Sequence, residues 1–165
     1  MKLSKLILIR PDRISLVNVK ELANLQKKTG WNRVSKYIID SYAWIEYLEG
    51  TEQGKIVSEL ISNPSNEIYT LPIMVAEVLS KALRAKNKSI YKNALTALET
   101  IPYIINIDFS IGKKAGRIHF EERKLQKDFG LADAFLLASS EELKAKIVTS
   151  DPHFKNKKNI VFLSL

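Results

Sequence analysis

Short apolar runs alternate with amphipathic stretches along most of the chain. Five runs have the Ile-, Val-, Tyr- and Thr-rich composition of β-strands, and they cover residues 36–40, 67–70, 103–107, 146–149 and 160–163. Apolar residues recur at helical spacing over residues 42–48, 51–62, 72–86, 89–100, 108–127 and 131–143. Strands that alternate with helices predict a three-layer α/β/α fold with a central, mostly parallel sheet of about five strands.

The first 35 residues follow a different pattern. Residues 14–19 alternate between apolar and polar side chains like a short strand, and residues 19–28 suit a helix that ends at Thr29-Gly30. Because the series of strands and helices is complete without them, we interpret residues 1–35 as an N-terminal extension and residues 36–165 as the domain. Three readings of the extension stay open: a peripheral appendage, a basic arm that contacts nucleic acid, or an incorrectly assigned start.

The net charge of +8 is unevenly distributed. Residues 1–33 hold eight basic and two acidic side chains, which accounts for most of it. Within the domain, residues 36–80 hold two basic and seven acidic side chains, whereas residues 81–127 hold eleven and four. An acidic segment followed by a basic one therefore says more about partners than the total charge does.

The chain has no cysteine and only two histidines, His119 and His153. Disulfides, thiolate catalysis and cysteine-ligated zinc are therefore excluded. Any metal would be held mainly by oxygen, which favours Mg²⁺ or Mn²⁺ over zinc. No apolar run approaches the roughly 18 residues needed to span a bilayer, and the run at residues 6–9 is too short for a signal peptide. We therefore expect a cytoplasmic protein without a membrane partner.

Four carboxylates stand where a parallel sheet gathers its chemistry. Asp40 and Asp151 come at or just after the ends of expected strands, and Glu77 and Asp133 lie in the first turns of largely apolar helices. Those places share the carboxyl edge of the sheet, so the four side chains are expected to lie close together. Carboxylates repel by about 4 kcal/mol per pair at about 4 Å and an effective dielectric of about 20. A hard divalent cation is the simplest way to neutralise such a cluster.

Each carboxylate also has a purely structural explanation. Asp40, Asp133 and Asp151 all suit helix caps, where a carboxylate accepts backbone N–H groups. Glu77 suits an ion pair with Lys81 one helical turn later, although a charge among apolar neighbours is costly to bury unless it is paired or bound to metal. The combination of four favours a metal site more than any single member does.

The sequence offers no serine elbow and no glycine-rich phosphate loop. Bound Mg²⁺ or Mn²⁺ can lower the pKa of a water and stabilise charge on a phosphate oxygen without them. Basic side chains follow the acidic segment and would hold a polyanion there, although each alone suits a solvated helix surface: Lys81, Arg84, Lys86, Lys88, Lys113, Lys114 and Arg117. An acidic centre with basic flanks is what metal-dependent phosphodiester cleavage needs.

Four motifs resemble those of the PIN-domain nucleases, and within that family the VapC-like toxins. They are Tyr37-Ile38-Ile39-Asp40-Ser41, Val75-Ala76-Glu77-Val78-Leu79 and the stretches at residues 131–138 and 147–154. The resemblance covers residues 36–165 and implies a PIN-like (Rossmann-like) fold. It also implies a Mg²⁺- or Mn²⁺-dependent endoribonuclease whose catalytic metal ligands are Asp40, Glu77, Asp133 and Asp151, with Ser41 and Thr149 supporting them.

The resemblance further implies an RNA substrate, a homodimer and a co-expressed antitoxin that silences a toxin. The antitoxin would lie along the first helices, on a surface that suits an ordinary core equally well: Trp44, Tyr47, Leu48, Ile56 and Leu60. The 35-residue extension departs from the compact family pattern, which leaves the oligomeric arrangement open.

Two alternatives keep the fold but change the function: an RNA-processing PIN nuclease without an antitoxin, and a catalytically inactive PIN-like binding module. Two other enzyme classes fit poorly. A phosphatase of the haloacid-dehalogenase type needs a second Asp where Tyr42 stands, and a receiver domain needs an acidic pair near the first strand, where Asp40 has no adjacent acid.

Overall fold

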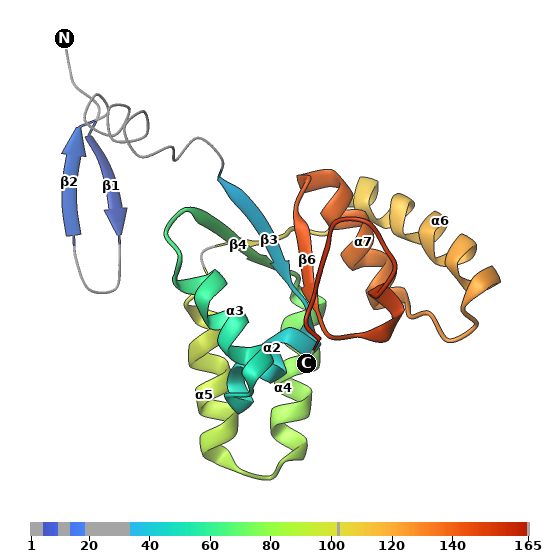
Figure 1. The fold of residues 1–165 in the computed structure, drawn as a ribbon, viewed down its shortest axis with the longest axis horizontal. Helices are drawn as coiled ribbons and strands as arrows, with labels where there is room; N and C mark the ends of the chain where they lie inside the picture. The colour runs from blue at the N-terminus through green and yellow to red at the C-terminus, as the bar shows by residue number, and fades with distance from the viewer. Residues whose placement is uncertain (1–4, 10–13, 19–33, 102, 165) are drawn as a thin grey trace. The chain divides into compact units, whose positions relative to one another are not determined.

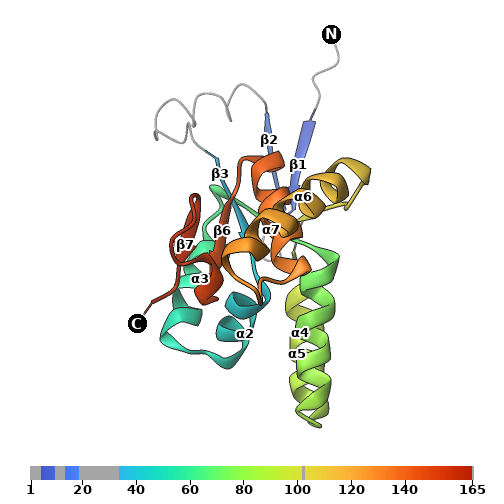
Figure 2. The same ribbon diagram turned by 90° about the vertical axis from the view of Figure 1, so that its right-hand side faces the viewer.

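The computed structural model describes most of the chain, namely residues 5–9, 14–18, 34–101 and 103–164. The chain divides into two compact units, Met1–Val34 and Ser35–Leu165, shown from two directions in Figures 1 and 2. Within the described residues, no helix is both long and apolar enough to cross a membrane.

The first unit contains a two-stranded antiparallel sheet. Strand β1 (Lys5–Ile9) pairs with β2 (Ile14–Asn18), and Ile9 lies opposite Ile14 in the register. Strand β2 falls where the alternating pattern predicted one. The helix predicted at residues 19–28 lies outside the described residues.

Five parallel strands form the sheet of the second unit in the order β5-β4-β3-β6-β7. Their bounds are β3 Ser35–Ile39, β4 Asn66–Thr70, β5 Tyr103–Ile104, β6 Lys146–Thr149 and β7 Ile160–Phe162. Strand β3 occupies the centre, where Ile38 pairs with Tyr69 of β4 on one side and Ile147 of β6 on the other. The predicted α/β fold with a parallel sheet of about five strands is confirmed.

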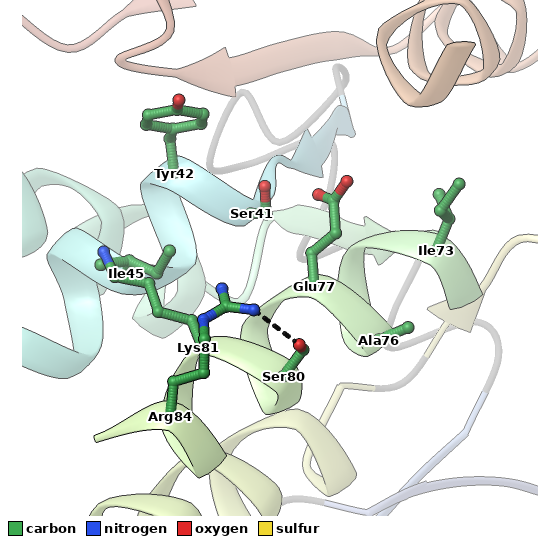
Figure 3. Close-up of a pocket in the computed structure, with 9 residues that line it drawn as sticks. All are labelled: Ser41, Tyr42, Ile45, Ile73, Ala76, Glu77, Ser80, Lys81 and Arg84. Atoms are coloured by element: carbon green, nitrogen blue, oxygen red, sulfur yellow. Dashed lines mark hydrogen bonds between the residues drawn. The ribbon is translucent and has the colours of Figure 1, made fainter. Parts of the chain in front are cut away.

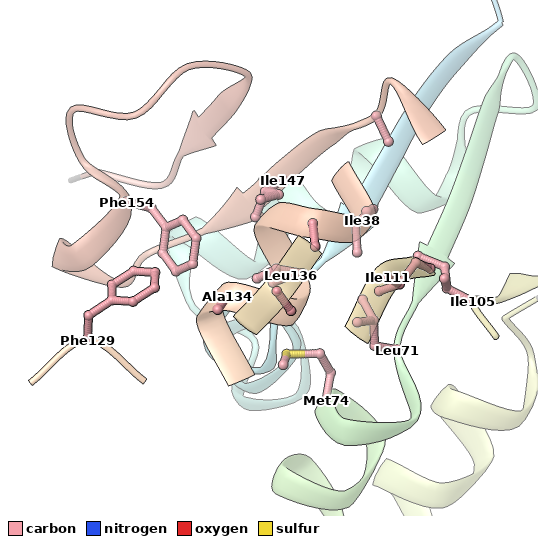
Figure 4. Close-up of a cluster of buried hydrophobic side chains, with 13 residues drawn as sticks. Ile38, Leu71, Met74, Ile105, Ile111, Phe129, Ala134, Leu136, Ile147 and Phe154 are labelled. Atoms are coloured by element: carbon pink, nitrogen blue, oxygen red, sulfur yellow. The ribbon is translucent and has the colours of Figure 1, made fainter. Parts of the chain in front are cut away.

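Helices cover both faces of this sheet. The described α-helices are α2 Ser41–Glu49, α3 Glu52–Ser62, α4 Pro72–Arg84, α5 Lys88–Glu99, α6 Phe109–Leu125 and α7 Leu131–Leu143, and a short 3₁₀ helix, η1, spans Pro152–Phe154. Successive strand residues point to opposite faces, so Ile38 joins one core with α6 and α7 while Ile39 joins the other with α2 to α5. Figure 4 shows the first core, in which Phe129 and Phe154 lie together at one end.

Strand β5 is shorter than predicted, because only Tyr103 and Ile104 of residues 103–107 belong to it. The Ile105 N–H still donates to the Thr70 carbonyl at 2.9 Å, after which the chain leaves the sheet. Asp108 then caps α6 by accepting from the Ile111 N–H at 2.9 Å. An edge strand has a neighbour on one side only, so few hydrogen bonds hold further residues in the ladder.

Trp44 does not belong to an open surface. Its side chain is 1% exposed and packs in the second core, so this part of the predicted antitoxin surface is wrong. The helical stripe of α2 that carries Trp44 faces the sheet and α3 rather than solvent. Tyr47, Leu48 and Leu60 are partly buried against the same core, whereas Ile56 is 42% exposed.

Gly54 sits at the tightest contact between α2 and α3. A Cβ added to Gly54 would overlap the Glu46 carbonyl and lie 2.9 Å from the Tyr47 Cα, both of them backbone atoms of α2. We predict that Gly54→Ala lowers the free energy of unfolding by more than about 2 kcal/mol, as measured by urea denaturation. The control Gly112→Ala, in helix α6 with nothing within 4 Å of the added Cβ, is expected to raise stability by up to about 1 kcal/mol. Equal effects of the two changes would contradict the contact.

Candidate metal centre

Asp40 lies where the central strand passes into helix α2. Its backbone N–H donates to the Val148 carbonyl at 3.1 Å, and the strand ends one residue earlier than predicted, at Ile39. As the N-cap of α2, Asp40 accepts the Ser41 N–H on Oδ1 at 2.6 Å, while the Ser41 hydroxyl lies 3.4 Å from the same oxygen. The Asp40 residue is only 3% exposed, so its carboxylate is both a cap and a buried acid.

Thr149 links two of the predicted site residues, Asp40 through its carboxylate and Asp151 through its backbone. Its hydroxyl donates to Asp40 Oδ2 at 2.6 Å and accepts the Asp151 backbone N–H at 2.9 Å. The register of β3 and β6 makes this possible, because Ile39 lies opposite Val148 and the next residue of each strand follows in step. The ends of the two strands are therefore linked by side chains as well as by backbone.

Asp133 and Asp151 meet a third group, His153, beside this junction. One ligand atom from each of the three lies within 4.8 Å of the other two. Asp133 accepts the Gly130 N–H on Oδ2 at 3.0 Å at the start of α7, and Asp151 accepts the His153 N–H on Oδ1 at 2.9 Å. Asp133 and Asp151 therefore both accept the capping hydrogen bonds that the sequence predicted. The same two carboxylates also lie close together.

Glu77 reaches the site from α4 but is not buried. It lines an open pocket of about 540 Å³ together with Ser41, Tyr42, Lys81 and Arg84, and Figure 3 shows its carboxylate on the side of the Ser41 hydroxyl. The sequence left open whether Glu77 is buried among its apolar neighbours or exposed, and the structure shows that it is exposed. The apolar neighbours of Glu77 in the sequence lie on other faces of α4. The predicted ion pair of Glu77 with Lys81 is replaced by a contact of 3.9 Å between Lys81 Nζ and Glu49 Oε1.

The pKa shifts of the neighbouring groups show that the four carboxylates lie close enough to act on the same side chains. Burial raises the pKa of Asp40 to about 7, with Asp133 and Asp151 adding to the shift and the bonds from Thr149 and Ser41 opposing it. Burial likewise raises the pKa of Asp133, and Asp151 and Glu77 contribute. The pKa of Tyr42 is raised first by Asp151, then by burial and by the other three carboxylates. All four predicted residues are thus within electrostatic reach of one side chain.

Sequence reasoning missed His153 and Asp128. Burial acts to lower the pKa of His153, but Asp128, Asp151 and Asp133 together outweigh it and raise the pKa. Two histidines are too few for a histidine-rich metal site, but one of them, His153, follows Asp151 by two residues. That spacing was the available signal, whereas Asp128 becomes a neighbour only through the fold.

The donor set fits a divalent cation. The carboxylates of Asp133 and Asp151 converge, and the buried Asp40 carboxylate is linked to Asp151 through Thr149. Hard cations prefer such oxygens. Among the described residues, the His153 Nδ1 atom is buried and lacks a hydrogen-bond partner, although it faces two of these carboxylates. A cation between Nδ1 and the carboxylates of Asp133 and Asp151 would give this buried nitrogen a partner.

The chain belongs to the PIN domain family, whose family model matches residues 37–160. No curated protein sequence matches at a significant level. Several solved structures share the fold of this chain at low sequence identity, which confirms the PIN-like architecture.

Three of these structures illustrate the likeness. A toxin–antitoxin complex from Klebsiella pneumoniae is 21% identical with a TM-score of 0.62, covering 78% of this chain and 98% of that one. VapBC2 from Rickettsia felis, bound to a DNA fragment from its promoter, is 18% identical with a TM-score of 0.61, covering 77% and 96%. The sarcin-ricin loop cleaving toxin VapC20 from Mycobacterium tuberculosis is 14% identical with a TM-score of 0.60, covering 78% and 99%.

The raised pKa of Asp40 makes a prediction about stability without metal. Since the folded-state pKa of about 7 exceeds the ordinary 3.8, the folded protein binds the extra proton between these values and loses stability as pH rises through them. We therefore expect Asp40→Asn, in EDTA, to be more stable than wild type at pH 8 by roughly 1–3 kcal/mol, with the advantage shrinking toward pH 4. Urea denaturation across this pH range is the measurement.

The matched control is Asp108→Asn, which replaces the exposed cap of α6 by another good capping residue. Its stability difference from wild type should not grow with pH. An Asp40→Asn protein that is less stable than wild type at pH 8 would contradict the charge repulsion.

Proposed function

We propose that this protein is a Mg²⁺- or Mn²⁺-dependent endoribonuclease whose metal ligands and catalytic residues are Asp40, Glu77, Asp133 and Asp151. The observation that carries the proposal is the junction of β3 and β6, where Thr149 bonds to both Asp40 and Asp151 while Asp133 lies within reach. A divalent cation held there supplies an activated water and positive charge beside the phosphate.

The protein's own residues orient the carboxylates. Thr149 and the Ser41 backbone fix the two oxygens of Asp40, so that both point in defined directions before any ligand arrives. The Gly130 N–H holds one oxygen of Asp133, Oδ2. Such preorganisation lets the site bind charge without reorganising during the reaction.

The pocket beside Glu77 suits single-stranded RNA. Lys81 and Arg84 line it together with Tyr42, whose side chain is half exposed and stands at the rim in Figure 3. We infer that the two cations hold the RNA backbone and that the Tyr42 ring stacks on a base. Lys81 has one long contact, 3.9 Å from its Nζ to Glu49 Oε1, whereas Lys114 is held by two carboxylates, those of Glu141 and Glu142, and therefore contributes less to this surface.

We further propose that the nuclease is the toxin of a type II pair, acting in the cytoplasm as a homodimer and inhibited by an antitoxin. A second pocket supports this. The charged residues Glu49, Lys81 and Arg84 line part of it, and apolar side chains make up much of the rest of its lining: Ile45, Leu48, Val78, Ala82 and Ile90. A short amphipathic segment of an antitoxin would cover it. The structures that share the fold include toxin–antitoxin complexes.

The first test is RNA cleavage. We expect the purified protein to cleave RNA with Mg²⁺ or Mn²⁺, to stop in EDTA, and to lose roughly 100-fold or more of its rate in Asp133→Asn. Asparagine keeps an oxygen for the Gly130 N–H, so the variant should stay folded. Glu59→Gln, an exposed carboxylate on α3, is the control that should keep full activity.

Unchanged cleavage in Asp133→Asn would overturn the metal-site assignment, and no cleavage by wild type would favour an inactive binding module. The neighbouring gene separates the remaining alternative. A small overlapping reading frame with a DNA-binding N-terminus supports the toxin, whereas a lone gene supports RNA processing without an antitoxin.

The second test addresses the pocket. Arg84→Gln should weaken binding of a single-stranded RNA to the Asp133→Asn protein and reduce the salt dependence of affinity by about one counterion. The control Lys55→Gln removes an equal charge from the exposed face of α3. Fluorescence anisotropy across a salt series makes the comparison, and equal slopes in both variants would exclude Arg84 as an RNA contact.

A further inference from the structure

His153 is held between two sets of carboxylates. Its Nδ1 atom lies 3.3 Å from Asp151 Oδ1 and 3.7 Å from Asp133 Oδ2, while Nε2 lies 3.3 Å from Asp128 Oδ2. The ring packs edge-on against Phe129 with 6.0 Å between centroids. The His153 N–H bond to Asp151 fixes the backbone turn that carries the ring.

The two ring nitrogens have different environments. Nε2 faces Asp128, which is exposed, and a carboxylate there favours the proton on Nε2. Nδ1 is buried, and it lacks a hydrogen-bond partner within the part of the chain that the structure describes. In the neutral ring with the proton on Nε2, the Nδ1 lone pair points into the space that Asp133 and Asp151 share.

Beside carboxylate oxygens, Nδ1 is favourable only if a positive charge lies there, which is either a second ring proton or a metal ion between the nitrogen and the carboxylates. A carboxylate behind the outer nitrogen of an imidazole is the usual partner of a metal-binding histidine, because it fixes the ring's orientation and proton. His153 has this arrangement: Asp128 lies behind Nε2, and Asp133 and Asp151 lie in front of Nδ1.

We propose that His153 binds the cation of this centre through Nδ1 and that Asp128 is its positioning residue. The proposal rests on the proposed metal site and specifies its chemistry: one nitrogen among carboxylate oxygens. Mg²⁺ prefers oxygen donors, whereas Mn²⁺ accepts imidazole more readily. The centre therefore selects Mn²⁺ over Mg²⁺ more strongly than its carboxylates alone would.

The most direct test needs no variant. Pulsed electron paramagnetic resonance of the Mn²⁺-loaded full-length protein should show coupling to a nitrogen nucleus, and labelling histidine with ¹⁵N should change that coupling. Absence of nitrogen coupling in protein that binds Mn²⁺ overturns the assignment of His153 while leaving the carboxylate site in place.

Titration calorimetry with Mn²⁺ and Mg²⁺ gives an independent measure. In His153→Phe, which keeps the ring against Phe129, we expect Mn²⁺ affinity to fall by roughly tenfold or more and the nitrogen coupling to vanish, with less than about threefold change for Mg²⁺. Asp128→Asn should weaken Mn²⁺ binding by roughly tenfold while keeping the coupling. His119→Phe, the only other histidine, is the matched control and should change neither.

The outcomes separate the two proposals. Equal loss of Mn²⁺ and Mg²⁺ in His153→Phe, or no loss of either, overturns the ligand role of His153. Failure of wild type to bind either cation more tightly than Asp133→Asn overturns the metal site itself and the inference with it.

Discussion

The parallel pairing of β3 with β6 is the constraint on which the rest of the domain depends. It puts Asp40 and Thr149 at the same level of the sheet, where the Thr149 hydroxyl donates a 2.6 Å hydrogen bond to the Asp40 carboxylate. Strand β3 also sends Ile38 and Ile39 into opposite cores. A slip of one residue would exchange these faces and separate the two polar side chains, so one register fixes both packing and chemistry.

Burial of several acids at this edge opposes folding. Asp40 is nearly inaccessible and Asp133 is half buried, and the pKa of each is raised mainly by that burial. The large cores on both sides of the sheet offset the cost, since a well-packed core stabilises a domain by far more than a few buried carboxylates destabilise it. The site is thus less favourable for stability than apolar residues would be, which is common where function sets the residues.

Much of the domain was predictable because helices and strands leave strong periodic signals, and the ends of parallel strands have known positions. Asp40 and Asp151 could be found in this way. The exposure of Glu77 could not, since apolar neighbours along a helix do not share one face. His153 follows Asp151 by two residues and could have been found from that spacing, whereas its partner Asp128 lies 25 residues away in the sequence and meets it only after folding. The shortness of β5 depended on its edge position, which composition does not reveal.

The order of the strands has a consequence for synthesis. The central strand β3 is made early, yet its neighbour β6 and the residues that follow come from the last part of the chain. A fragment that ends before residue 149 contains neither the hydroxyl of Thr149 nor Asp151. The acidic edge is therefore incomplete until this segment has been made, so Asp40 and Glu77 wait for partners that are synthesised long after them.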